Sequence, residues 1–126
     1  PRHTLSINTS TPSQYAALAA LTGPQDALHA MRDAYAERRA FLMQAFRDLG
    51  LTYGFPGGAF YLYTNVTSSG QGAADFCLRL LQEGRVMVFP GAMFGDDEDA
   101  YIRISYLQPL DRIREAVDRM AKVLRT

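Results

Sequence analysis

One arginine lies at the centre of an otherwise apolar stretch of the chain. Residues 100–106 have the sequence AYIRISY, in which apolar and polar side chains alternate as they do in a β-strand. This alternation predicts that Ile102 and Ile104 lie on one face of the strand and Arg103 on the other. A guanidinium group does not lose its charge in a protein, so Arg103 must face water, an acid or a ligand.

Two interpretations of Arg103 are open. In the first, the side chain lies on the solvent-facing side of a sheet that is covered on one face only. In the second, it binds a carboxylate or a phosphate, because arginine offers two parallel N–H donors to a planar anion. The neighbours Tyr101, Ser105 and Tyr106 and two preceding glycine turns favour a site, since glycine lets a backbone approach a ligand closely.

Two Pro-Gly segments are candidate binding loops. In FPGGAF, residues 55–60, Gly57 and Gly58 permit unusual backbone angles, although the segment also fits an ordinary turn before a strand. The segment VFPGAMFG, residues 88–95, has the same two interpretations. It is not a phosphate-binding P-loop, because it lacks the Gly-Lys-Ser/Thr ending and no helix clearly follows it.

The histidine, cysteine and acidic residues form no recognisable metal or nucleophile motif. His3 and His29 have no metal-ligand spacing to another histidine or cysteine. Cys77 lies on the apolar face of a predicted helix, where packing explains it. The acidic residues 96–99 lack the alternating ligands of a calcium loop and predict a solvated loop. We therefore expect no metal site.

Lys122 is the only lysine in the sequence. It lies near the end of the predicted last helix, which is terminal and amphipathic. Schiff-base chemistry needs a lysine that is held in a pocket and partly desolvated, and this position does not suggest one. If the protein works through a lysine imine, we expect that lysine to lie outside this chain.

Composition limits the classes of partner. The chain has 126 residues, of which 48% are hydrophobic and 21% charged, as in a globular protein with one modest core. Its 13 basic residues balance 13 acidic ones, and its longest apolar run, residues 15–21, is too short to cross a bilayer. We therefore expect neither nucleic acid nor a membrane as partner. The single cysteine and the absence of a signal-peptide pattern predict a cytoplasmic protein.

Hydrophobic periodicity and capping residues predict the helices. They cover residues 13–21, 22–50, 73–83 and the chain from residue 109 onward. Thr11 is the expected cap of the first helix, Thr22 and Gln25 have the spacing of a capping box for the second, and Gly50 and Gly84 are expected ends. The long second helix has an apolar stripe that Arg38 interrupts: Leu28, Met31, Tyr35, Leu42, Ala45 and Leu49.

Strands are predicted over residues 59–66, 86–89 and 100–107. This order of elements predicts an α+β fold, with a small sheet of about three strands, helices packed on one of its faces, and a long bridging helix before it. The chain begins at Pro1, and its first ten residues predict no element of their own. We interpret this as a processed terminus or a fragment of a longer protein.

Four segments in order resemble one known family. They are TPSQYAALAALTGPQD with MRDAYAERR, then PGGAFYLY, then LLQEGRVMVFPGAMFG, then YIRISY. Together they are similar to the C-terminal part of the class I/II aminotransferases, which are fold type I enzymes that use pyridoxal 5'-phosphate (PLP). The resemblance covers nearly the whole chain. It implies that residues 1–23 end the large PLP-binding domain and residues 24–126 form the small domain with its bridging helix.

The resemblance also implies a role for Arg103. The arginine of the RIS segment in this family binds the α-carboxylate of the amino-acid substrate in a bidentate salt bridge. Gly58 and Phe60 of the GGAF turn are expected on the substrate side of the cleft. The family's Schiff-base lysine, its pyridine-pairing aspartate and most of its phosphate ligands lie upstream, so this chain is expected to hold no catalytic residue and no cofactor ligand.

The resemblance therefore implies a PLP-dependent aminotransferase acting on an α-amino acid and a 2-oxo acid as a homodimer. The leading segment SINTSTPSQ, residues 6–14, resembles the stretch that approaches the neighbouring subunit's active site. The chain alone is expected to be inactive. Three alternatives stay open: another PLP-dependent reaction on the same scaffold, the aminotransferase-like effector domain of a transcription regulator, and a stand-alone interaction module.

Overall fold

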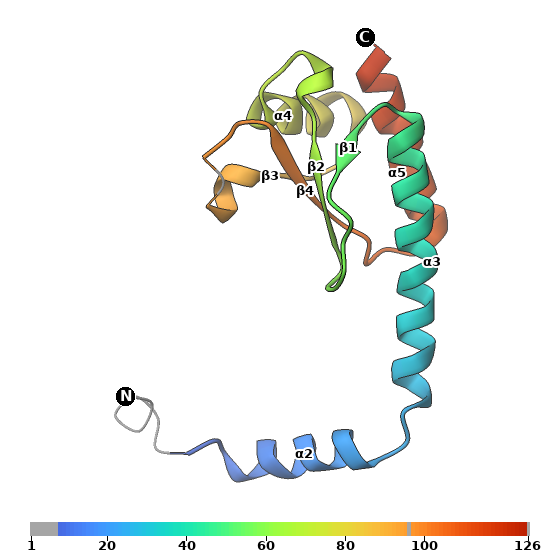
Figure 1. Cartoon of the computed structure of the whole chain (residues 1–126), viewed down its shortest axis with the longest axis vertical. Helices are drawn as coiled ribbons and strands as arrows, with labels where there is room; N and C mark the ends of the chain where they lie inside the picture. The colour runs from blue at the N-terminus through green and yellow to red at the C-terminus, as the bar shows by residue number, and fades with distance from the viewer. Residues whose placement is uncertain (1–7, 96, 126) are drawn as a thin grey trace. The chain divides into compact units, whose positions relative to one another are not determined.

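A computed structural model describes residues 8–95 and 97–125 of the chain (Figure 1). The elements are α2 (Thr11–Thr22), α3 (Asp26–Asp48), β1 (Thr52–Tyr53), β2 (Tyr61–Asn65), the 3-10 turn η1 (Thr67–Ser69), α4 (Ala73–Gly84), β3 (Phe89–Pro90), the 3-10 turn η2 (Gly91–Phe94), β4 (Tyr101–Ser105) and α5 (Leu110–Arg125).

The chain divides into two compact units, one up to Arg32 and one from Asp33, so α3 contributes to both. The expectation for His3 lies outside the described residues. No described helix is long and apolar enough to cross a bilayer.

Helix α2 has different capping from the one predicted. Ser10 is its N-cap residue, and Thr11 is already helical. The expected capping box between Thr22 and Gln25 is also wrong. The Thr22 hydroxyl donates to the carbonyl oxygen of Leu18 at 2.8 Å, one turn back in α2, and α3 begins only at Asp26. A threonine that bonds to the preceding turn is not available to cap the next helix.

Helix α3 uses only the C-terminal half of its apolar stripe. Leu42 and Phe46 are buried, whereas Leu28 and Met31 are more than half exposed. The C-terminal end of α3 is the one predicted from Gly50. Gly50 has φ +74°, its N–H donates to the carbonyl of Arg47 at 3.0 Å, and the next N–H donates to the carbonyl of Phe46 at 2.9 Å. This pair of bonds is a Schellman motif, in which glycine takes the left-handed conformation without steric cost.

Arg38 does not simply interrupt the stripe. Its Nη1 donates to the carbonyl oxygen of Leu107 at 2.8 Å, and its guanidinium lies 5.2 Å from the centre of the Tyr35 ring. The arginine therefore joins α3 to the segment that follows β4.

The predicted α+β fold is confirmed, with one strand more than expected. The sheet is antiparallel in the order β1-β2-β4-β3. The additional strand β1 has only two residues. Residues 86–88 were predicted as strand but are not, and only Phe89 and Pro90 pair with β4. The reason is local: α4 ends at Gly84, and Arg85 takes the left-handed conformation with φ 56°, which turns the chain before it reaches the sheet.

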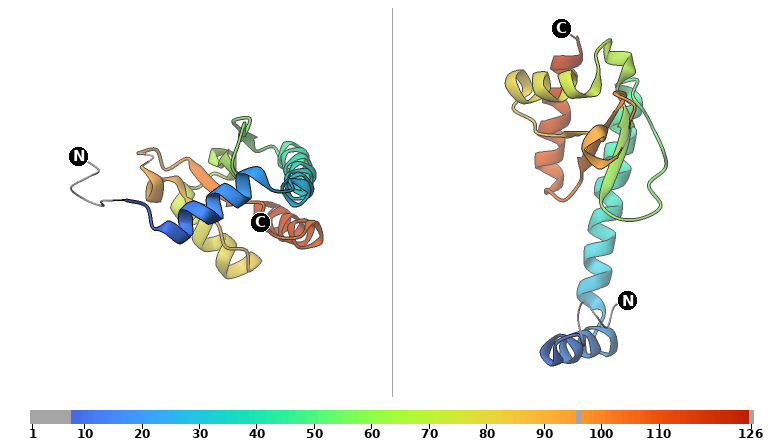
Figure 2. Two further views of the ribbon diagram at one scale, coloured as in Figure 1. Left: turned by 90° about the horizontal axis from the view of Figure 1, so that it is seen from below. Right: turned by 90° about the vertical axis from the view of Figure 1, so that its left-hand side faces the viewer.

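The hydrophobic core lies on one face of the sheet. Leu62 of β2 and Ile102 of β4 have no exposed surface and pack with buried residues from α3, α4 and α5. Figure 2 shows α4 and α5 packed together beside the sheet. Helices α4 and α5 and the C-terminal half of α3 therefore cover one face, as predicted, and the alternation of β4 directs Arg103 to the other.

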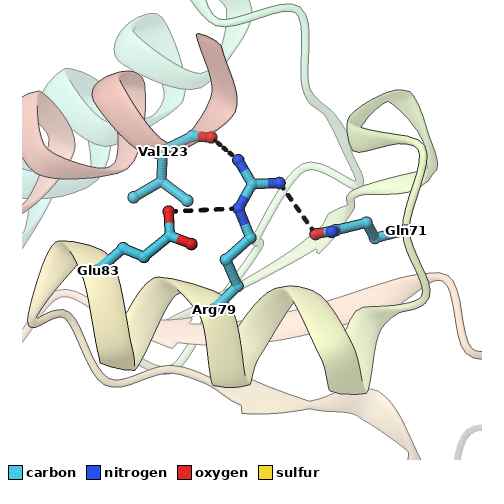
Figure 3. Close-up of polar contacts among 4 residues, drawn as sticks. All are labelled: Gln71, Arg79, Glu83 and Val123. Carbon is cyan, nitrogen blue, oxygen red and sulfur yellow. Dashed lines mark hydrogen bonds and ion pairs between the residues drawn. The ribbon is translucent and has the colours of Figure 1, made fainter. Parts of the chain in front are cut away.

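Arg79 joins α4 to the last turn of α5 (Figure 3). Its guanidinium donates to the carbonyl oxygen of Val123, and to Gln71 Oε1 at 3.2 Å. Its Nε donates to Glu83 Oε2 at 3.4 Å. The last carbonyls of a helix have no partner within the helix, so an arginine from a neighbouring element stabilises that end.

The acidic loop is exposed at all three of its described acids, Asp97, Glu98 and Asp99, and Asp99 has a structural role as well. Asp97 and Glu98 are exposed, as predicted, and Asp96 lies outside the described residues. The backbone carbonyl of Asp99 accepts from the N–H of Ala73 at 2.9 Å, and its Oδ1 accepts from the N–H of Ala74 at 2.9 Å. Asp99 therefore caps the N-terminus of α4 from a distant part of the chain.

Candidate anion-binding site

The face of the sheet opposite to α4 and α5, called the uncovered face below, carries aromatic side chains around one arginine. In the strand register Arg103 lies opposite Tyr63 of β2 and Phe89 of β3. The Tyr63 ring stacks on Tyr101 with ring centres 5.5 Å apart and planes 18° apart. The predicted alternation of residues 100–106 is therefore confirmed.

Two aromatic rings contact the Arg103 guanidinium. Its central carbon lies 4.3 Å from the centre of the Tyr61 ring and 3.3 Å from the centre of the Phe94 ring. Both distances are within the range of cation–π attraction. The Nε atom is buried and has no hydrogen-bond acceptor, and in residues 8–95 and 97–125 no carboxylate pairs with this side chain. A fixed positive charge with an unused donor and no counter-charge suits an incoming anion.

Phe94 reaches Arg103 because the preceding segment forms a 3-10 turn. Pro90 begins the turn with φ −67°, and Gly95 ends it with φ 88°. Glycine is required there because L side chains rarely take that conformation. The segment VFPGAMFG therefore brings an aromatic ring, not backbone amides, to the site.

Arg103 was a candidate from the sequence, but its two ring partners, Tyr61 and Phe94, were not. A signal for Tyr61 was present, because alternation along residues 59–66 puts it on the same face as Tyr63. No periodic signal indicates Phe94. Its position depends on the turn and on the pairing of β3 with β4.

The glycines of the GGAF turn do not use the left-handed conformation that they permit. Neither Gly57 nor Gly58 has positive φ; the strained residue is Ala59, with φ 56°. Gly58 is exposed, and a Cβ atom there would have nothing within 4 Å. The Phe60 ring lies 4.6 Å from the Tyr61 ring, so Phe60 is separated from Arg103 by one aromatic side chain.

Tyr106 holds the same turn in place from the end of β4. Its N–H donates to the carbonyl of Phe60 and its hydroxyl to the carbonyl of Ala59, both at 3.0 Å. Burial raises the pKa of Tyr106 above its ordinary value, and the charge of Arg39 acts against that rise. A neutral hydroxyl is the form that can donate this bond.

The other candidates lie away from Arg103 or lack reactivity. Cys77 is buried, and burial together with the charge of Asp99 raises the pKa of its thiol to about 11, so it is packing and not a nucleophile. Lys122 and His29 are exposed, on α5 and α3. The described residues contain no group of three His, Cys, Asp or Glu side chains that could hold a metal.

Comparison with known proteins identifies the class. The model of the family "Aminotransferase class I and II" matches residues 2–120, and the chain belongs to this family. It is 38% identical over 114 residues to the aspartate aminotransferase of Pyrococcus abyssi, a match that covers 89% of this chain and 29% of that protein. It is 36% identical to aromatic-amino-acid aminotransferase 2 of Thermococcus litoralis, with the same coverage.

Solved structures agree with this assignment. The aromatic aminotransferase of Pyrococcus horikoshii OT3 superposes with a TM-score of 0.83 at 36% identity, over 89% of this chain and 30% of that one. The alanine aminotransferase of Pyrococcus furiosus superposes with a TM-score of 0.87 at 29% identity, over 97% of this chain and 32% of that one. The chain thus spans about three tenths of the length of these relatives.

Proposed function

We propose that this chain is the C-terminal part of a PLP-dependent aminotransferase that exchanges an amino group between an α-amino acid and a 2-oxo acid. Arg103 would bind the substrate α-carboxylate. The observation that carries this proposal is the Arg103 guanidinium itself. It lies on the face of the sheet opposite to α4 and α5, in contact with two aromatic rings, and without a counter-charge in the described residues. A bidentate arginine fixes the orientation of a carboxylate, which aligns the bonds of the substrate α-carbon for reaction.

The residues of this chain do not fit PLP itself. Its one lysine, Lys122, is exposed on α5, and α5 packs against the opposite face of the sheet from Arg103. We propose that the cofactor, its lysine and its phosphate ligands belong to a region of the protein outside these 126 residues. The chain alone would then bind a carboxylate without catalysing a reaction.

Gly58 and Phe60 have secondary roles in the proposal. Phe60 supports Tyr61, which in turn contacts Arg103. Gly58 leaves open space beside the turn, where a side chain would narrow the approach. The homodimer, the cytoplasmic location and the domain limits at residues 23 and 24 belong to the same proposal. Family membership supports the homodimer.

The amino-acid side chain that the enzyme accepts is left open. Three relatives with 29–38% identity are aminotransferases named for aspartate, for aromatic amino acids and for alanine. The proposal is therefore limited to the groups that these reactions share, an α-carboxylate and an amino group.

The experiment uses the complete protein purified with PLP. It is incubated with a panel of ¹⁵N-labelled amino acids and 2-oxo acids, and the products are identified by mass spectrometry. Transfer of the label to the 2-oxo acid with retention of both carbon skeletons supports the proposal. Loss of a substituent or ring closure without transfer would show a different PLP-dependent reaction, and no reaction with any pair would contradict the assignment.

A further inference from the structure

Two aromatic rings lie against the Arg103 guanidinium. Its central carbon is 3.3 Å from the centre of the Phe94 ring, a separation that suits stacking on the flat face of the group, and 4.3 Å from the centre of the Tyr61 ring. The N–H bonds lie in the plane of the group. Nε is buried, so the donors that an incoming carboxylate can reach are those of the two Nη atoms. An anion therefore reaches Arg103 along that plane, where two N–H groups can meet two carboxylate oxygens.

The two rings have different origins. Tyr61 belongs to β2, which pairs with β4 along its whole length, so its position follows from the sheet. Phe94 belongs to the 3-10 turn η2 and is 44% exposed. It is therefore the less constrained of the two rings, and replacing it would not open a cavity in the core.

An arginine side chain loses much conformational freedom when it is fixed for binding. In many proteins a carboxylate partner holds the arginine in advance. Here no carboxylate of the described residues does so, and a partner of that kind would compete with the substrate. Aromatic rings restrain the group without using its N–H donors, and within residues 8–95 and 97–125 no acceptor is bonded to them.

We propose that Phe94, together with Tyr61, is a positioning residue for the substrate-binding arginine. The two rings hold the guanidinium plane before the substrate arrives and direct its N–H edge to the site of a planar carboxylate. This inference rests on the proposed function, because it takes Arg103 as the carboxylate ligand. The 3-10 turn η2 would then contribute to the affinity for the substrate and not to a step in the reaction.

The test uses the complete enzyme with its best amino-acid substrate. Phe94→Leu keeps an apolar side chain but removes the ring. We expect KM for the amino acid to rise about tenfold while kcat changes less than threefold. The inhibition constant of 3-phenylpropanoate, a carboxylate without an amino group, should rise by a similar factor. Phe94→Tyr, which keeps the ring, should return both constants to within twofold of the parent.

The matched control is Phe41→Leu. Phe41 of α3 also stacks on an arginine, with the Arg114 carbon 4.4 Å from its ring centre, but it packs against the core and not on the uncovered face. Its replacement should leave KM and the inhibition constant within twofold. An equal rise in the Phe94→Leu and Phe41→Leu enzymes would show a general loss of structure and would overturn the inference.

Two further variants separate this inference from the proposed function. Tyr61→Leu removes the opposite ring and should also raise KM and the inhibition constant. If Arg103→Ala raises both constants but Phe94→Leu and Tyr61→Leu leave them at parental values, the positioning role is wrong and the proposed function stands. If Arg103→Ala changes neither constant, the proposed function is wrong and this inference with it.

Discussion

A methyl group in place of the Gly72 hydrogen would overlap Oδ2 of Asp99. The two residues are far apart in the sequence, yet Asp99 caps the helix that begins directly after Gly72. The cap therefore depends on two residues together: an acid that supplies the acceptor, and a glycine that leaves room for it.

The first prediction concerns Asp99. Asp99→Ala removes the acceptor for the N–H of Ala74 and should lower the free energy of unfolding by about 1 kcal/mol, as for other lost helix caps. The measurement is urea unfolding of the chain followed by circular dichroism. Asp97→Ala is the control, since this exposed acid has no such bond, and it should change stability by less than about 0.5 kcal/mol. Equal effects of the two substitutions would show that only net charge matters.

The second prediction is a double-mutant cycle. Gly72→Ala should destabilise the chain because its Cβ would displace the Asp99 carboxylate and break the cap. In the Asp99→Ala background the clashing atoms are absent, so Gly72→Ala should cost clearly less. The same unfolding assay gives all four stabilities. Additive effects would mean that Gly72 is needed for the local backbone conformation and not to leave room for the Asp99 cap.

The third prediction concerns Arg79. Arg79→Met keeps the aliphatic stem and loses the bonds to Val123 and Gln71, which should cost about 1.5–3 kcal/mol, the range for charge-assisted bonds. Arg112→Met breaks an exposed ion pair with Glu115 and should cost less than about 1 kcal/mol. Calorimetric unfolding of the two variants compares them directly. A larger loss from Arg112→Met would contradict this account of how α4 and α5 are joined.

The fourth prediction concerns the pH dependence of Cys77. Folding raises the pKa of this thiol from 9.0 to about 11, so the folded state holds the proton more tightly than the unfolded state. Stability should therefore be unaffected by this group below pH 9 and should fall as the pH rises from about 9 to about 11. Unfolding midpoints in urea at a series of pH values measure this, and a Cys77→Ala variant should lose that part of the decline.

The same shift predicts low reactivity. At pH 8 the thiolate fraction in the folded chain should be about a hundredfold lower than in the unfolded chain, because a pKa difference of two units corresponds to that factor. Labelling by iodoacetamide should thus be at least that much slower in buffer than in 8 M urea, and comparable rates would contradict the burial of Cys77.

The regular elements could be predicted where one physical signal dominates. The apolar period of residues 73–83 and the glycine after α3 were enough to place α4 and the end of α3. Strand β1 was missed because two residues contain no alternation, and Thr52 and Tyr53 form a strand only because β2 lies beside them.

The residues of the site also divide into one that the sequence could predict and others that it could not. Alternation placed Arg103 on the uncovered face, since a period of two is a property of the strand alone. Its contact with Phe94 depends on a turn and on strand pairing, which are tertiary features. Gly57 and Gly58 permit a left-handed conformation, but it is Ala59 that takes it, where the Tyr106 hydroxyl bonds to its carbonyl. A tertiary contact of this kind leaves no signal in the local sequence.

The most direct test of the central claim is the value of kcat/KM for the Arg103→Ala variant of the complete enzyme, measured with its best amino-acid substrate. Loss of a charged partner of the carboxylate should cost about 2–5 kcal/mol of transition-state stabilisation, which is a fall of roughly 30-fold to several thousandfold. A value within threefold of the parent would show that Arg103 does not bind the substrate carboxylate.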